Sequence, residues 1–176
     1  MADRRTGPVA FLFLGETLLI PHLWPVAEAL ARDGDVAVDL WVATSVHEEL
    51  LTRWSAGLGD HVLIRRAPGF RSLPGMAPGD NPPLPAKLPL LARLAPRLWN
   101  TPVAVCAEQT SLWIPRAVPF HPTRFVKTSH GVGSMSARDD KRRRAARAMC
   151  VPSERERATY LERGFDADRV IATGYV

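Results

Sequence analysis

Short apolar runs alternate with stretches of helical periodicity along the whole chain. The runs that we expect to be strands are Val9–Leu14, Val36–Thr44, His61–Ala67, Val103–Ala107, Arg124–Ser129, Ala148–Val151 and Arg169–Thr173. Between the first two runs, Val26, Ala27, Leu30 and Ala31 recur at helical spacing, and Gly34 ends that pattern. Strands that alternate with helices are typical of a parallel sheet with helices on both faces. The sequence therefore predicts a Rossmann-like α/β fold.

Two serines mark expected helix starts. Ser45 with Glu48 three residues later forms a capping-box pattern, which predicts a helix running to Trp54. Ser153 is the expected N-cap of a later helix that ends before Gly164, because serine accepts the free amides of a first turn and glycine favours the conformation that ends a helix.

The middle of the chain is rich in proline. Residues 68–85 hold six prolines and three glycines, so we expect no regular structure there. The following segment, Leu84–Trp99, has a leucine stripe, two arginines opposite it and no acidic residue, and Pro89 and Pro96 should split its helix. Core packing is one interpretation of this segment, and peripheral contact with an anionic membrane surface is the other.

The composition fits one soluble domain over residues 1–176. The chain is 46% hydrophobic and 23% charged, and it contains no apolar run close to the roughly 20 residues that cross a bilayer. The first run, Val9–Leu14, is too short for a signal peptide and is closed by Gly15 and Glu16, so we expect a cytoplasmic protein. Cys106 and Cys150 lie in apolar runs without metal-ligand spacing and are expected to be buried packing residues.

The net charge of +5 favours anionic partners. The strongest basic run, Arg138–Arg147, holds six basic residues, and we interpret it as a solvated helix face. Because no aromatic residue interrupts this run, we expect no nucleic-acid binding.

Candidate site residues follow the expected strands, because open α/β sheets bind ligands at the carboxyl ends of their strands. After the fifth strand, Ser129 and Ser134 can donate to a phosphate, Gly131 and Gly133 allow close backbone approach, and His130 can serve as a general base. Two further candidates for substrate binding are Glu108, after the fourth strand, and His22, after the first. No metal-ligand pattern is present, and we expect neither a metal nor a cofactor.

Several short motifs resemble the CDP-glycerol glycerophosphotransferase family. They are Lys127–Gly133 with its His-Gly pair, Met149–Glu154 with Val-Pro-Ser-Glu, Tyr160–Phe165 with a terminal Gly-Phe, and Val170–Tyr175 with Thr-Gly-Tyr. The resemblance covers about the last third of the chain. Many family members carry a lysine a few residues after His-Gly, whereas Val132–Asp140 contains none.

The resemblance implies the N-terminal half of a GT-B enzyme, whose second half binds the nucleotide. Such an enzyme transfers glycerol phosphate from CDP-glycerol to a hydroxyl of a polyol or glycan acceptor in a wall or capsule polymer, with His130 as the base. The chain ends directly after an expected strand, so we expect a nucleotide-binding half to be missing and little turnover from this chain alone.

Two alternatives stay open. One is half of a nucleotide-sugar glycosyltransferase or epimerase on the same GT-B scaffold. The other is a non-catalytic module that binds an anionic polymer or membrane through the arginine run and Leu84–Trp99.

Overall fold

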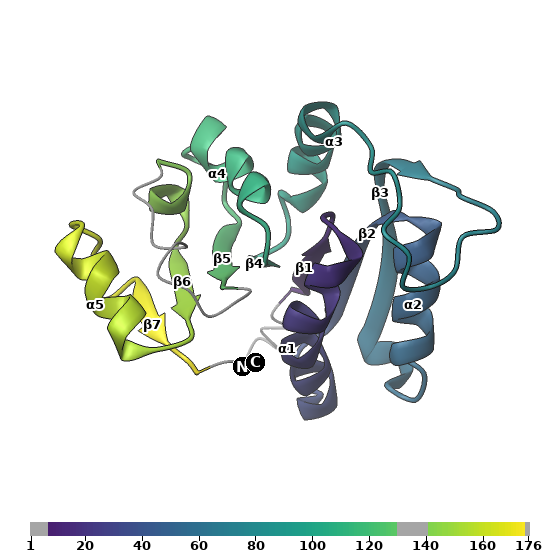
Figure 1. Ribbon diagram of the computed structural model, residues 1–176, viewed down its shortest axis with the longest axis horizontal. Helices are drawn as coiled ribbons and strands as arrows, with labels where there is room; N and C mark the ends of the chain where they lie inside the picture. The colour runs from purple at the N-terminus through teal and green to yellow at the C-terminus, as the bar shows by residue number, and fades with distance from the viewer. Residues whose placement is uncertain (1–6, 130–140, 175–176) are drawn as a thin grey trace, which may run out of the picture.

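The computed structural model describes residues 7–129 and 141–174 and confirms the predicted fold class. Its centre is a parallel sheet of seven strands in the order β3-β2-β1-β4-β5-β6-β7 (Figure 1). The strands are β1 (Val9–Phe13), β2 (Val38–Thr44), β3 (Val62–Arg71), β4 (Val103–Cys106), β5 (Arg124–Thr128), β6 (Ala148–Val151) and β7 (Val170–Ala172).

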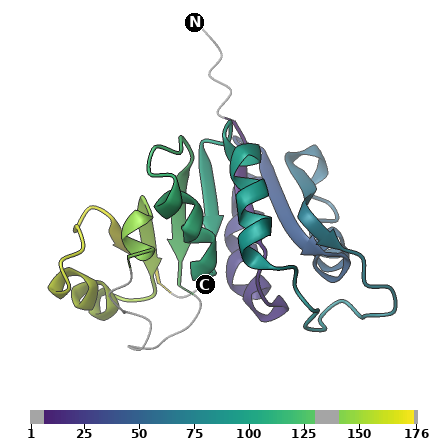
Figure 2. The ribbon, with the colours of Figure 1, turned by 90° about the horizontal axis from the view of Figure 1, so that it is seen from above.

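Helices cover both faces of the sheet. One layer holds α1 (Ile20–Asp33) and α2 (Ser45–Trp54), and the other holds α3 (Lys87–Leu94), α4 (Trp113–Ala117) and α5 (Glu154–Glu162) (Figure 1). Seen from above, α5 with β6 and β7 lies at one end of the molecule, and α2 with β2 and β3 lies at the other (Figure 2). Short 3₁₀ turns complete the connections: η1 (Thr17–Leu19), η2 (Gly59–His61), η3 (Ala95–Leu98), η4 (Gln109–Leu112) and η6 (Arg143–Ala145).

Alternation along the strands divides the core between the two layers. Phe11 and Phe13 pack with α1, whereas Leu12 and Leu14 pack with α3 and α4. Successive side chains of a strand point to opposite faces, so a strand buried on both faces appears in the sequence as a continuous apolar run. This relation explains why the positions of the strands could be predicted.

The Leu84–Trp99 segment is split, as expected from its prolines. Helix α3 ends at Leu94, and Pro96 lies in the first turn of η3. Its buried leucines face the core: Leu90, Leu91, Leu94 and Leu98. Core packing is therefore the correct interpretation for most of the stripe, although Leu88 is 67% exposed. Among the helices in the described ranges, none has both the length and the apolar character needed to cross a bilayer.

One prediction about the proline-rich segment was wrong. Strand β3 continues through Pro68 to Arg71, where we expected irregular structure. Proline lacks a backbone donor but is tolerated on an edge strand, and β3 lies at the edge of this sheet. Residues 72–86 contain neither helix nor strand, as expected.

The start of α2 also differs from the prediction. Thr44, not Ser45, is the N-cap, and its hydroxyl accepts the backbone N–H of His47 at 3.4 Å. The Ser45 hydroxyl instead accepts the backbone N–H of Leu73 at 2.9 Å. Together with the hydrogen bond from the Thr17 hydroxyl to the Asp80 carbonyl, at 2.6 Å, this contact holds the 72–86 segment over the carboxyl ends of β1 and β2.

Ser153 caps α5 as predicted, and its hydroxyl accepts the Glu156 N–H at 3.2 Å. We expect Ser153→Ala to lower the free energy of unfolding by about 1 kcal/mol, because a first-turn amide loses its acceptor. Urea unfolding followed by circular dichroism measures the change. Ser55→Ala is the matched control, since this hydroxyl only donates to the Thr52 carbonyl at a helix end. Equal stability losses in both variants would contradict the capping role.

Candidate functional site

The strand order reverses between β1 and β4, which are neighbours in the sheet. The chain builds β2 and β3 on one side of this point and β5 to β7 on the other, and such a reversal opens a crevice at the carboxyl ends of the strands. Gly15 follows β1 here, and Glu108 follows β4. This carboxyl edge is therefore the candidate site.

An ion pair occupies the point of reversal. The Lys87 ammonium, from the first turn of α3, lies 2.8 Å from Glu108 Oε2 and 2.9 Å from Oε1, and it also donates to the Leu14 carbonyl. The Ser111 hydroxyl donates to Glu108 Oε1 at 3.0 Å. The Lys87 and Glu108 side chains are only 24% and 11% exposed, so both charges depend on these partners.

Position 15 requires glycine because the Glu108 carboxylate lies very close to its backbone. A Cβ atom at this position would lie 2.9 Å from Glu108 Oε2 and 3.0 Å from a methyl of Leu19. Any larger residue would displace the carboxylate, so the glycine and the ion pair form one arrangement.

A fully buried histidine lies near the ion pair. Neither ring nitrogen of His47 has a hydrogen-bond partner of normal geometry among the described residues. Burial lowers the pKa of His47 to about 4; a backbone group of Phe13 opposes this shift, and the Lys87 ammonium adds to it. The ring is therefore neutral at physiological pH. The sequence predicts a surface or packing residue at this position, and the burial of His47 fits packing.

Strand β5 carries a buried lysine toward the α3 and α4 layer. Lys127 is 7% exposed, and its ammonium donates to the Thr128 carbonyl. Burial lowers the pKa of Lys127 to about 8, while the carboxylates of Glu156 and Glu108 oppose the shift. Burial also raises the pKa of the neighbouring Cys106 thiol to about 12, so Cys106 is unreactive packing, as expected.

A hollow of about 280 Å³ opens at the same edge, on the α1 face of the sheet. We call it the carboxyl-edge hollow. Its lining comes from α1 and from the ends of β4 to β7: His22, Val26, Val105, Val126, Thr128, Ser129, Cys150, Val151, Pro152, Thr173 and Gly174. The structure thus brings together two predicted site residues, His22 and Ser129. Cys150 is half-buried and lines the hollow, so our prediction of a buried thiol was wrong for this residue.

The third described candidate, Glu108, lies at the carboxyl edge as predicted, but its carboxylate is held by Lys87. The Ser129 hydroxyl donates to Glu156 Oε1 at 3.4 Å while the residue also lines the hollow. The other predicted site residues, His130, Gly131, Gly133 and Ser134, lie outside the described residues, and their roles stay predictions.

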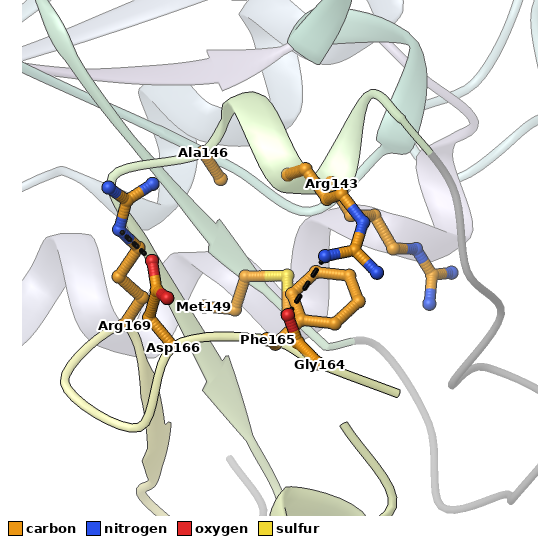
Figure 3. Close-up of a pocket in the computed structure, with 8 residues that line it drawn as sticks. Arg143, Ala146, Met149, Gly164, Phe165, Asp166 and Arg169 are labelled. Atoms are coloured by element: carbon orange, nitrogen blue, oxygen red, sulfur yellow. Dashed lines mark hydrogen bonds and ion pairs between the residues drawn. The ribbon is translucent and has the colours of Figure 1, made fainter. Parts of the chain in front are cut away.

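The described part of the arginine run is not a solvated helix face. Residues 143–145 form a short 3₁₀ turn, and the guanidinium groups of Arg142, Arg143 and Arg144 lie over the rings of Trp113, Tyr160 and Phe165, respectively. Figure 3 shows the resulting hollow of about 130 Å³ between Arg143, Met149, Phe165 and Arg169. Arg144 donates to the Gly164 and Arg163 carbonyls, so this arginine caps the end of α5.

The sequence analysis did not identify Lys87 as a site residue. It named Lys127 only as the first residue of a motif and assigned it no function. A usable signal existed for Lys87, because it is one of only three lysines in an arginine-rich chain and follows the proline-rich segment. Within residues 7–129 and 141–174, no group of three or more His, Cys, Asp or Glu side chains is arranged to hold a metal ion.

Several solved structures share this fold. A UDP-bound S. aureus MnaA has a TM-score of 0.63 at 12% identity, covering 96% of this chain and 45% of its own. The Neisseria meningitidis UDP-GlcNAc 2-epimerase bound to UDP-GlcNAc has a TM-score of 0.57 at 13% identity, covering 96% and 46%. The UDP-GlcNAc 2-epimerase of Methanocaldococcus jannaschii has a TM-score of 0.55 at 11% identity, covering 96% and 45%.

The chain spans about half the length of these proteins, and its sheet matches half of a GT-B type scaffold. No family model and no curated protein matches the sequence. The resemblance to CDP-glycerol glycerophosphotransferases was wrong, because the similar structures include UDP-GlcNAc 2-epimerases and no family model supports the motifs. The glycerol phosphate transfer and the CDP-glycerol donor were expected only from that resemblance, so these two predictions are wrong as well.

The depressed pKa of His47 makes stability depend on pH. The unfolded chain takes up a proton near pH 6.5 and the folded chain only near pH 4, so stability is full above pH 6.5 and is lost as the pH falls through this window. We expect His47 to account for a loss of about 2 kcal/mol between pH 7.5 and pH 5.

His47→Leu should remove that part of the loss while keeping or raising stability at pH 7.5, because neither ring nitrogen has a hydrogen-bond partner of normal geometry among the described residues. Urea unfolding at the two pH values measures it. The control is His61→Leu, since His61 is an exposed histidine at the end of η2, just before β3. A pH dependence that is the same in wild type and His47→Leu would show that His47 does not titrate as inferred.

Proposed function

We propose that this chain forms one half of a two-domain nucleotide-sugar enzyme, and that epimerisation of a UDP-activated amino sugar at C2 is its activity. The observation that carries the proposal is the carboxyl edge, where a shielded carboxylate–ammonium pair lies at the strand reversal and a hollow opens beside β5 and β6. The fold shared with UDP-GlcNAc 2-epimerases supports this choice of substrate class.

The size of the hollow supports a divided site. Pockets that enclose a small-molecule ligand measure roughly 300–1,000 Å³, and the carboxyl-edge hollow measures about 280 Å³. It has room for one ring of a nucleotide sugar but not for the whole molecule. In this proposal, the chain supplies the sugar-side wall over residues 1–176, and a second α/β half binds most of the nucleotide.

The lining of the hollow suits one face of a sugar. Val26, Val105 and Val126 contribute apolar side chains to the lining, and Thr128 and Ser129 contribute residues with hydroxyl groups. Apolar side chains pack against the C–H groups of a ring, while a few polar groups fix its orientation. His22 adds an imidazole to this lining.

Glu108 is the proposed acid–base or hydroxyl-binding group at the strand reversal. Its contacts with Lys87 and Ser111 fix its orientation. His130 follows Ser129 directly in the sequence and stays our proposed general base. Epimerisation requires a proton to leave and return at carbon, and these groups are the candidates for that transfer.

A binding experiment tests the sugar-side wall. We expect UDP-GlcNAc added to the ¹⁵N-labelled chain to shift the amide signals of Ser129, Cys150 and Thr173, with a dissociation constant on the order of 1 mM, because half a site gives only a few contacts. His22→Ala should weaken binding about fivefold, the value of one hydrogen bond of about 1 kcal/mol to a sugar hydroxyl. His61→Ala is the control and should bind as wild type.

Glu108→Gln keeps the size of the side chain and removes its charge, so it separates electrostatic from steric effects at the strand reversal.

Amide shifts in the UDP-GlcNAc titration that map away from the carboxyl edge, or no shifts at all, would overturn the proposal. We expect the chain alone to give no detectable C2 epimer. UDP release that requires an added glycan acceptor, without epimerisation, would assign the edge to a glycosyltransferase instead.

A further inference from the structure

The amino edge of the central strands, opposite the candidate site, carries two exposed aromatic rings. Trp99 lies just before β4 and is 46% exposed, and Phe120 lies just before β5 and is 78% exposed. Their ring centroids are 6.4 Å apart. Because parallel strands start at the same edge of a sheet, two segments distant in the sequence present these rings side by side.

The two segments are fixed to each other. His121 Nε2 lies 2.9 Å from the Ala95 carbonyl oxygen, and the centroid of the His121 ring lies 5.0 Å from that of Trp99. The Thr123 hydroxyl donates to the Leu98 carbonyl at 2.5 Å. The rings are thus held in place before any partner arrives, which lowers the entropy cost of binding.

The surroundings of the rings are basic. Arg93 and Arg97 lie in the last turns of α3 and η3, Arg116 lies in the last turn of α4, and Arg124 begins β5; all four are exposed. Residues 81–129 contain one acidic side chain, Glu108, and it is paired with Lys87 at the opposite edge. No described carboxylate forms an ion pair with these four arginines.

We propose that this aromatic–arginine edge (Trp99 and Phe120 with the four arginines) docks the protein on an anionic lipid surface. Aromatic rings favour the interface between lipid headgroups and acyl chains, and basic residues beside them are attracted to anionic headgroups. The inference does not depend on the proposed function. It assigns the lipid contact to this edge and not to the leucines of Leu84–Trp99, most of which pack in the core.

Two other partners fit less well. A symmetric contact with a second copy would bring the same arginines against each other, and like charges across an interface oppose association. Single-stranded nucleic acid stacks its bases on open aromatic surface, whereas Trp99 packs against both Phe120 and His121, with ring centroids 6.4 and 5.0 Å away.

Vesicle sedimentation tests the proposal. We expect the chain to bind vesicles of equal parts phosphatidylglycerol and phosphatidylcholine more tightly than pure phosphatidylcholine, and added salt to weaken this binding. Arg97→Gln and Arg124→Gln should each reduce partitioning about fivefold, and Phe120→Ser should also reduce it. The controls are Arg155→Gln and Leu18→Ser, which change an exposed arginine and an exposed leucine elsewhere, and these should bind as wild type.

Trp99→Phe gives a second readout. It keeps an aromatic ring, so binding should persist, but quenching of tryptophan fluorescence by brominated lipid should fall. Failure to sediment with anionic vesicles, or losses that are equal in the control variants, would overturn the proposal. A concentration-dependent dimer that Phe120→Ser abolishes would also overturn it, because a second copy would then cover this edge.

Discussion

The ion pair between Lys87 and Glu108 joins three parts of the fold at the point where the strand order reverses. Lys87 belongs to α3, Glu108 follows β4, and the Leu14 carbonyl that also accepts from Lys87 follows β1. Removing either charge leaves the other shielded from water and unpaired, which costs more than the pair itself contributes. The packing of α3, the glycine at position 15 and the shape of the carboxyl edge all depend on this contact.

The fold could be predicted because its strands are buried on both faces, and a short, continuous apolar run such as Val38–Thr44 is typical of a strand in that position. The predictions that were wrong, the end of β3 and the N-cap of α2, concern features that depend on tertiary contacts. Pro68 is compatible with β3 only because β3 is an edge strand. Thr44 and Ser45 are both residue types that cap helices well. The choice between them depends on Leu73, 28 residues further along the chain, whose backbone N–H donates to the Ser45 hydroxyl.

The site was predicted in part for the same reason. His22 and Ser129 follow strands, so a rule about strand ends places them at the carboxyl edge, and both line the same hollow there. Their roles in binding stay predictions. Lys87 is not next to the end of a strand in the sequence, so the rule about strand ends does not select it. Only the folded chain shows that α3 begins beside Glu108. The mistaken family resemblance has a related cause. A glycine after a strand, a Pro-Ser helix start and a Thr-Gly strand end are requirements of strand–helix connections, and proteins with different chemistry share them.

The two edges of the sheet differ because the helices of the α3 and α4 layer run antiparallel to the strands. Their first turns lie at the carboxyl edge, where Lys87 meets a carboxylate, and their last turns lie at the amino edge. The carbonyls at a helix end carry partial negative charge, which favours cations such as Arg93 and Arg116. The topology that creates the candidate site therefore also gathers exposed arginines at the opposite edge. A protein that rests on anionic lipid by its amino edge would hold its carboxyl edge, with the Lys87–Glu108 pair and the hollow, toward water and within reach of a soluble nucleotide sugar.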